Sequence, residues 1–86
     1  MMSSTERILY EQLRDSFIVV HKSREINKEM GTLDRDILRV SEDKIETVCK
    51  TIARDVTRFI EDEKRKGRNP TTTQIVNKIK EGLNNQ

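Results

Sequence analysis

The sequence predicts an all-α fold, a small bundle of three main helices with one short connector helix. Apolar residues return at the helical period in each longer segment, and pairs with helix-capping spacing precede two of these segments. Glycine and proline occur only at the junctions. The expected helices cover residues 4–28, 33–39, 42–66 and 71–83. With 86 residues, the chain is long enough for one domain, 1–86, with a modest core.

The first helix begins after Ser3, because Ser3 and Glu6 have the spacing of a capping box. Its inward face is a set of apolar residues at helical spacing: Leu9, Leu13, Phe17 and Val20. Two positions for the C-terminal end of this helix fit the sequence. Gly31 is a natural stop and places the end near residue 28, whereas the polar stretch that starts at His21 favours fraying from there.

A short connector helix follows, and then a fresh helix start. Thr32 or Asp34 can cap the connector. Its inward residues are Leu33, Ile37 and Leu38. Ser41 is an N-cap for the next helix, and the acidic residues after it favour the positive end of the helix dipole. A single helix over residues 34–66 is the alternative.

Residues 42–66 are the most strongly two-sided segment of the chain. One stripe is apolar and contains Ile45, Val48, Cys49, Ile52, Val56, Phe59 and Ile60. Nearly opposite it stands a row of cations, Lys50, Arg54, Arg58 and Arg65. We expect the apolar face to be buried and the cationic face to remain in solvent. Cys49 is therefore a small buried hydrophobe, and a single cysteine forms no internal disulfide.

The last helix is separated from this one by a turn. Gly67 ends the long helix, and Pro70 cannot sit in a helix interior. Thr71 and Gln74 repeat the capping-box spacing. The buried face of the last helix contains Ile75, Val76, Ile79 and Leu83.

The chain carries no recognisable catalytic or metal-binding pattern. One cysteine and one histidine cannot fill a tetrahedral zinc site, and three scattered glycines form no phosphate cradle. His21 has serines near it but no orienting acid, so we expect a surface side chain. No apolar run is long enough for a membrane span or a signal peptide. We predict a non-enzymatic, cytoplasmic protein with no cofactor, metal, membrane contact or small-molecule substrate.

Positive charge gathers toward the end of the chain. The net charge is only +2, but residues 62–86 hold six bases against three acids. Such a surface attracts a phosphate backbone or an acidic protein. The candidate nucleic-acid-binding residues are Lys50, Arg54, Arg58, Lys64, Arg65, Lys66 and Arg68. Thr47 and Thr51 share the face of the first three and can donate hydroxyl hydrogen bonds to phosphates.

The ordinary alternative for these cations is a solvated helix face. Glu46, Asp55 and Glu61 stand close enough in sequence to pair with them along the helix. Cations near a helix C-terminus also complement its dipole without any ligand.

Several apolar residues do not fit one inward stripe of the first helix. They are Ile8, Ile18, Val19, Ile26 and Met30. A bundle of three helices does not easily cover both sides of its first helix, so these positions predict a protein partner or a homo-oligomer.

The stretch KRKGRNPTTTQIVNKI, residues 64–79, resembles the opening of the helix–turn–helix in sigma-factor region 3 and in some winged-helix regulators. The matching residues are Gly67, Arg68, Pro70, Thr71 and Ile75, with Gln74 in place of the Glu of those families. There the turn leads into a supporting helix, and a separate recognition helix follows. No such helix follows Leu83 in this sequence, so the resemblance implies a transcription setting but no base-reading residue.

These patterns predict a non-catalytic helical accessory or regulatory protein that acts in transcription or replication. An apolar helix face would bind a protein partner, and the basic face would contact a phosphate backbone without reading bases. The alternative is a helical adaptor or homodimer with no nucleic-acid role.

Overall fold

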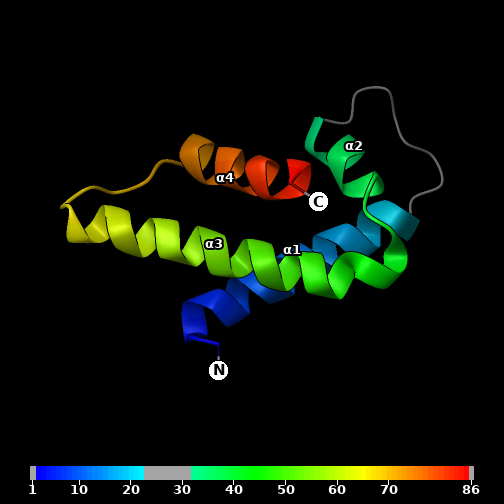
Figure 1. The fold of residues 1–86 in the computed structure, drawn as a ribbon, viewed down its shortest axis with the longest axis horizontal. Coiled ribbons are helices and arrows are strands. Elements are labelled where there is room, and N and C mark those ends of the chain that lie inside the picture. Colours follow the sequence, from blue (N-terminus) through cyan, green and yellow to red (C-terminus); the bar gives the residue numbers. More distant parts are fainter. Residues whose placement is uncertain (1, 23–31, 86) are drawn as a thin grey trace.

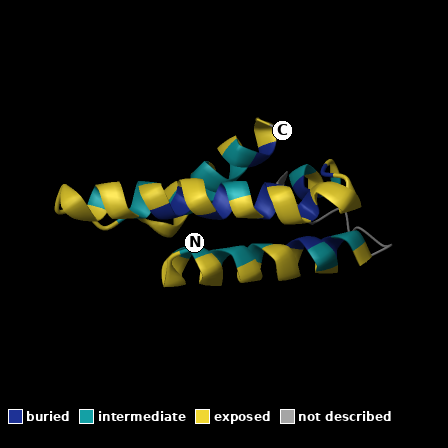
Figure 2. Cartoon of the chain, turned by 60° about the horizontal axis from the view of Figure 1, so that its bottom comes forward, coloured by how far each residue is buried: buried dark blue, intermediate teal, exposed yellow. Residues whose placement is uncertain are grey.

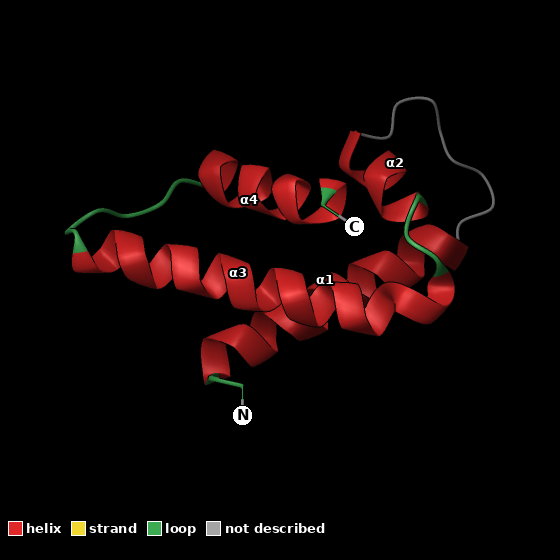
Figure 3. Ribbon diagram, viewed as in Figure 1, coloured by secondary structure: helices red, strands yellow, loops and turns green. Residues whose placement is uncertain are grey.

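The described part of the chain is all α-helical, as predicted. The computed structural model describes residues 2–22 and 32–85, the side chains of 32–34 excepted, and these residues contain no strand. The elements are α1 (Ser4–Lys22), α2 (Thr32–Leu38), a 3₁₀ turn (Glu42–Lys44), α3 (Ile45–Arg65) and α4 (Thr72–Asn84) (Figures 1 and 3). The expected part of the first helix beyond Lys22, with Ile26 and Met30, lies outside the described residues, as does the side chain of Leu33.

The central element is α3, against which α1 and α4 pack. One side of α3 contacts α1, and another contacts α4, which runs back along α3 after the turn at Gly67 (Figure 1). The short helix α2 contacts both α1 and α4 near the end of the molecule where α3 begins. The start of α1 lies beside the middle of α3 (Figures 1 and 2). This crossing places the N-terminal residues next to the cationic row.

The apolar stripe of α3 is buried, as predicted. The buried hydrophobic residues are Phe17, Val20, Ile37, Val40, Ile45, Val48, Cys49, Ile52, Ala53, Val56 and Leu83. Phe59 and Ile60, at the far end of the predicted stripe, are half-buried. The outer sides of α1 and α3 are mostly exposed (Figure 2). The burial pattern follows the helical period because one face of each helix meets its neighbours.

The end of α3 and the start of α4 confirm the predicted stop and cap. The amide of Arg68 donates to the carbonyl of Glu63 at 2.8 Å, and that of Gly67 to Lys64 at 3.0 Å. These two bonds are a Schellman motif, which needs a residue with positive φ, and Gly67 has a φ of 77°. In the capping box of α4, the amide of Gln74 donates to the Thr71 hydroxyl and the amide of Thr71 to the Gln74 side chain.

The other helix starts differ in part from the prediction. The amide of Glu6 donates to Ser3 Oγ at 3.2 Å, which is one half of a capping box. Ser41 takes the N-cap position of the 3₁₀ turn, but its side chain makes no capping hydrogen bond, so the cap expected there is wrong. The backbone carbonyl of Ser41 instead accepts a hydrogen bond from the amide of Lys44 at 2.9 Å.

A single helix over residues 34–66, the alternative considered above, is excluded by the bend between α2 and α3. The amide of Val40 donates to the carbonyl of Ile37 at 3.0 Å, and Ser41 then adopts an extended conformation. This turn directs Val40 and Ile37 into the core, where both are buried. A continuous helix would carry α2 away from α1 and α4 and lose that burial.

His21 is not the surface side chain that the sequence suggested. It is half-buried, and its Nε2–H donates to the backbone carbonyl of Ile37 at 3.1 Å, since a carbonyl can only accept. The bond joins the end of α1 to α2 across the segment 23–31. His21 therefore has a structural role, which spacing to nearby serines could not indicate.

Cys49 should resist alkylation in the folded protein. Its side chain is fully buried, and desolvation raises the pKa of the thiol from 9.0 to about 11. We expect iodoacetamide at pH 8 to react only when the domain opens, and at an ordinary rate in denaturant. Because the folded pKa is the higher one, the stability that the neutral thiol contributes is complete below pH 9.0 and declines as pH rises toward 11. Equal alkylation rates in buffer and denaturant would contradict this burial.

Candidate phosphate-binding groove

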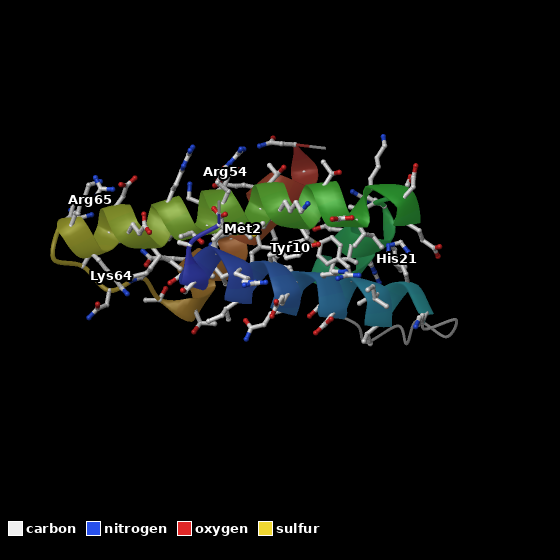
Figure 4. All side chains as sticks on the ribbon, turned by 90° about the horizontal axis from the view of Figure 1, so that it is seen from below. Met2, Tyr10, His21, Arg54, Lys64 and Arg65 are labelled. Carbon is white, nitrogen blue, oxygen red and sulfur yellow. The ribbon has the colours of Figure 1, made fainter. Side chains whose placement is uncertain are left out.

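The seven predicted cations are all exposed and form two groups on α3 and the turn after it. The group along the middle of α3 is Lys50, Arg54 and Arg58. The group at the C-terminal end of α3 and in the turn after it is Lys64, Arg65, Lys66 and Arg68. Figure 4 shows Arg54 beside Met2, and Lys64 and Arg65 projecting in different directions from the far end of the helix. The middle group borders a concavity.

That concavity is a groove of about 650 Å³ between the start of α1 and the middle of α3. Its lining residues are Met2, Ser3, Glu6, Lys50, Arg54, Thr57, Arg58 and Glu61. The three cations are successive members of an i, i+4 series, so their side chains leave α3 on one side, about 12 Å from first to last along the axis. The crossing of α1 supplies the opposite wall. We call this space the α1–α3 groove.

Lys50 is the most engaged of the three cations. Its ammonium lies 3.0 Å from the Glu46 carboxylate and 6.0 Å from the centre of the Tyr10 ring. The hydrogen bond and charge of Glu46 raise the pKa of Lys50, and Lys50 in turn lowers the pKa of Glu46. Both groups are exposed, so this pair adds little to stability. It does hold Lys50 in a defined position with its charge kept.

Arg54 and Arg58 are less closely paired with carboxylates than Lys50 is. The Nε of Arg54 lies 3.7 Å from Asp55, an exposed contact that leaves the terminal nitrogens of the guanidinium available. Arg58 forms no ion pair with any residue in the described ranges. Two carboxylates, Glu6 and Glu61, also line the groove. With three cations and two carboxylates, the groove carries a formal charge of +1.

Sequence reasoning missed Thr57, together with the residues Met2, Ser3 and Glu6 that form the opposite wall of the groove. Thr57 is only 4 % exposed, and its hydroxyl oxygen is buried without a hydrogen-bond partner among the described residues. Ala53, one turn earlier, is also fully buried. Two small residues one turn apart at the edge of an apolar stripe indicate a close contact on that side of α3, but they do not show which segment forms the other wall of the groove.

The second group of cations surrounds the Schellman turn. Arg65 lies 3.4 Å from Asp62, and Arg68 lies 4.0 Å from Glu63. Lys64 and Lys66 form no ion pair within the described part of the chain. These side chains extend the positive surface beyond the groove.

The predicted hydroxyl donors on the cationic face are partly used within the helix. Thr51 Oγ1 donates to the carbonyl of Thr47 at 3.0 Å, so Thr51 is not an unpaired donor. Such back-bonding along one turn is common for threonine in helices. The buried hydroxyl without an internal partner is that of Thr57, which lines the groove.

Of the apolar residues predicted as a protein interface, Ile8, Ile18 and Val19 lie within the described residues. Ile8 is 55 % and Val19 66 % exposed, and they share the outer side of α1 about 16 Å apart along its axis. Ile18 is half-buried and lines a separate pocket with Ile45 at the start of α3. The described residues therefore present two isolated aliphatic side chains on this helix.

Within residues 2–22 and 32–85, no cluster of three or more His, Cys, Asp or Glu side chains could hold a metal ion. None of the helices described is long and apolar enough to cross a membrane. No known family profile, no curated protein and no solved structure matches the chain.

Proposed function

We propose that this protein is a non-catalytic helical accessory module of a nucleic-acid-processing system that binds a phosphate backbone along α3. The observation that carries the proposal is the convergence of Lys50, Arg54 and Arg58 on one groove. Arg54 and Arg58 keep guanidinium nitrogens available there, and guanidinium forks match phosphate oxygens. The cations around Gly67 lengthen the positive surface, and the local resemblance to a helix–turn–helix opening supports the same setting.

The contact is with backbone and not with bases. Tyr10 lies beside Lys50 and Phe59 is half-buried next to Lys78, so among the described residues no aromatic ring stands free on the cationic side for stacking. Duplex DNA or RNA is thus a better ligand than an unpaired strand. Affinity then depends on counterion release and very little on sequence.

The binding of a fluorescent duplex should weaken steeply with salt. With three phosphate contacts, the association constant falls about 40-fold between about 50 and 200 mM salt, measured by anisotropy. Arg54→Gln and Arg58→Gln should each lower the slope of log K against log salt by about 0.9. Arg39→Gln is the matched control, because it removes an exposed guanidinium from α2's end, outside the groove. Salt-independent binding, or equal slopes for Arg39→Gln and Arg58→Gln, contradicts the proposal.

The protein partner belongs to the same proposal, with the outer side of α1 as its contact. Ile8 and Val19 are exposed on one side of α1, about 16 Å apart along its axis, and would mark the two ends of that contact. Sedimentation of the wild type and of an Ile8→Ser, Val19→Ser variant tests this part. A monomer at all concentrations, with no change in the variant, leaves nucleic-acid binding as the whole function.

A further inference from the structure

Thr57 has a side chain that the fold alone does not explain. A buried hydroxyl without a partner disfavours folding, and native proteins rarely retain one without a reason. A threonine inside a helix commonly donates to the carbonyl four residues earlier, but Thr57 Oγ1 makes no such bond to Ala53. Valine has nearly the same shape and would fill this position without the unpaired group. Its oxygen is closed to solvent in this structure, so the partner that it lacks would have to reach it from the α1–α3 groove, which Thr57 lines.

The neighbours of this hydroxyl restrict what that can be. Arg58 is the next residue and Arg54 lies just under one turn back, and both line the same groove as Thr57. Guanidinium groups only donate hydrogen bonds, and the hydroxyl has its proton to give. The matching ligand carries several acceptor oxygens and negative charge, as a phosphate does. We propose that the α1–α3 groove seats one phosphate group, with Thr57 Oγ1 as its buried donor.

The carboxylates select the kind of phosphate. Glu6 and Glu61 reduce the formal charge of the lining residues to +1, and Glu46, outside the lining, already pairs with Lys50. A phosphodiester has a single negative charge, whereas a phosphomonoester carries about −1.5 to −2 at pH 7. The groove therefore favours an internal backbone phosphate over a phosphorylated strand end or free phosphate. This inference rests on the proposed function, because it assigns one backbone phosphate of the bound duplex to Thr57.

Thr57→Val is the decisive variant. Duplex affinity at low salt should fall about tenfold or more, because a hydrogen bond to a charged group is lost. The melting temperature without ligand should rise by about 4–8 °C, because the unpaired hydroxyl is gone. Thr57→Ser keeps the hydroxyl and should bind within about twofold of the wild type. Glu61→Gln should bind the duplex more tightly, since a repelling carboxylate is removed.

Each other outcome has a definite meaning. If Thr57→Val binds like the wild type while Arg54→Gln and Arg58→Gln weaken binding, the phosphate site fails and the backbone proposal stands. If the wild type binds no duplex, the proposed function fails as well. An unchanged melting temperature in Thr57→Val shows that the hydroxyl finds an internal partner, which removes the basis of the inference. Tighter binding of a 5′-phosphorylated than of an unphosphorylated duplex, or competition by millimolar inorganic phosphate, overturns the choice of a diester.

Discussion

Phe17→Ala is expected to remove a large part of the protein's stability. Phe17 is fully buried, is among the largest side chains enclosed by the core, and joins α1 to the apolar stripe of α3. Truncating a buried phenylalanine costs about 3–5 kcal/mol. A domain of this size has about 4–13 kcal/mol in total. The variant should show a much lower midpoint in urea, followed by helical circular dichroism, and a substantial unfolded population at the low end of that range.

Val19→Ala is the matched control for this change. Val19 lies two residues from Phe17 on the same helix but is 66 % exposed, so its truncation should alter the free energy of unfolding by no more than about 0.5 kcal/mol. Similar losses in Phe17→Ala and Val19→Ala would mean that α1 does not present this face to α3.

The elements of this fold follow from signals that lie close together in sequence. The stripe on α3 predicted which residues are buried, because helical periodicity needs only neighbours within two turns. Gly67 and the pair Thr71–Gln74 predicted the turn and the last cap for the same reason. The Ser41 cap was wrong because a 3₁₀ turn, not an α-helical one, begins there. A local pattern identifies a helix start more reliably than the type of its first turn.

The candidate site depends instead on contacts between distant segments. Sequence placed Lys50, Arg54 and Arg58 on one face, but nothing in it showed that residues 2–6 would close a groove over them. The sequence also did not show which of these cations forms an ion pair within the helix. Glu46, Asp55 and Glu61 all had suitable spacing, and only the structure shows Glu46 held at 3.0 Å to Lys50 while Arg58 lacks such a contact in the described residues.

Buried polar groups were the least predictable feature. His21 and Thr57 each sit at the border between an apolar and a polar face, where periodicity assigns neither burial nor exposure. Ile37 of α2 offers His21 a carbonyl to bind, whereas Thr57 is buried without any such partner. The second case is informative for function because the fold buries the Thr57 hydroxyl but supplies no hydrogen-bond partner for it.

Gly82→Val should also destabilise the protein strongly, and the reason is the closeness of α4 to α3. A Cβ placed on Gly82 would lie 2.8 Å from Cγ1 of Ile52, which is shorter than side chains tolerate. Ile52 is fully buried and β-branched, so it has little room or rotamer freedom to move aside. Valine adds three carbons at this contact. We expect a loss of about 2–3 kcal/mol from overpacking, larger than the helix-propensity gain of about half a kcal/mol from replacing glycine.

The change should be rescued in part by Ile52→Ala. Alone, Ile52→Ala leaves a cavity and costs about 2–5 kcal/mol. Together the two substitutions remove three carbons from one side of the contact and add three on the other, so the volume of the core is nearly conserved. The double variant should be more stable than the sum of the single losses by about 1–3 kcal/mol in urea denaturation. Strictly additive losses would mean that α4 does not approach α3 at Gly82. In that case α4 does not cover the apolar stripe of α3, and the burial of this stripe cannot be what keeps the cations on the solvent side of the helix.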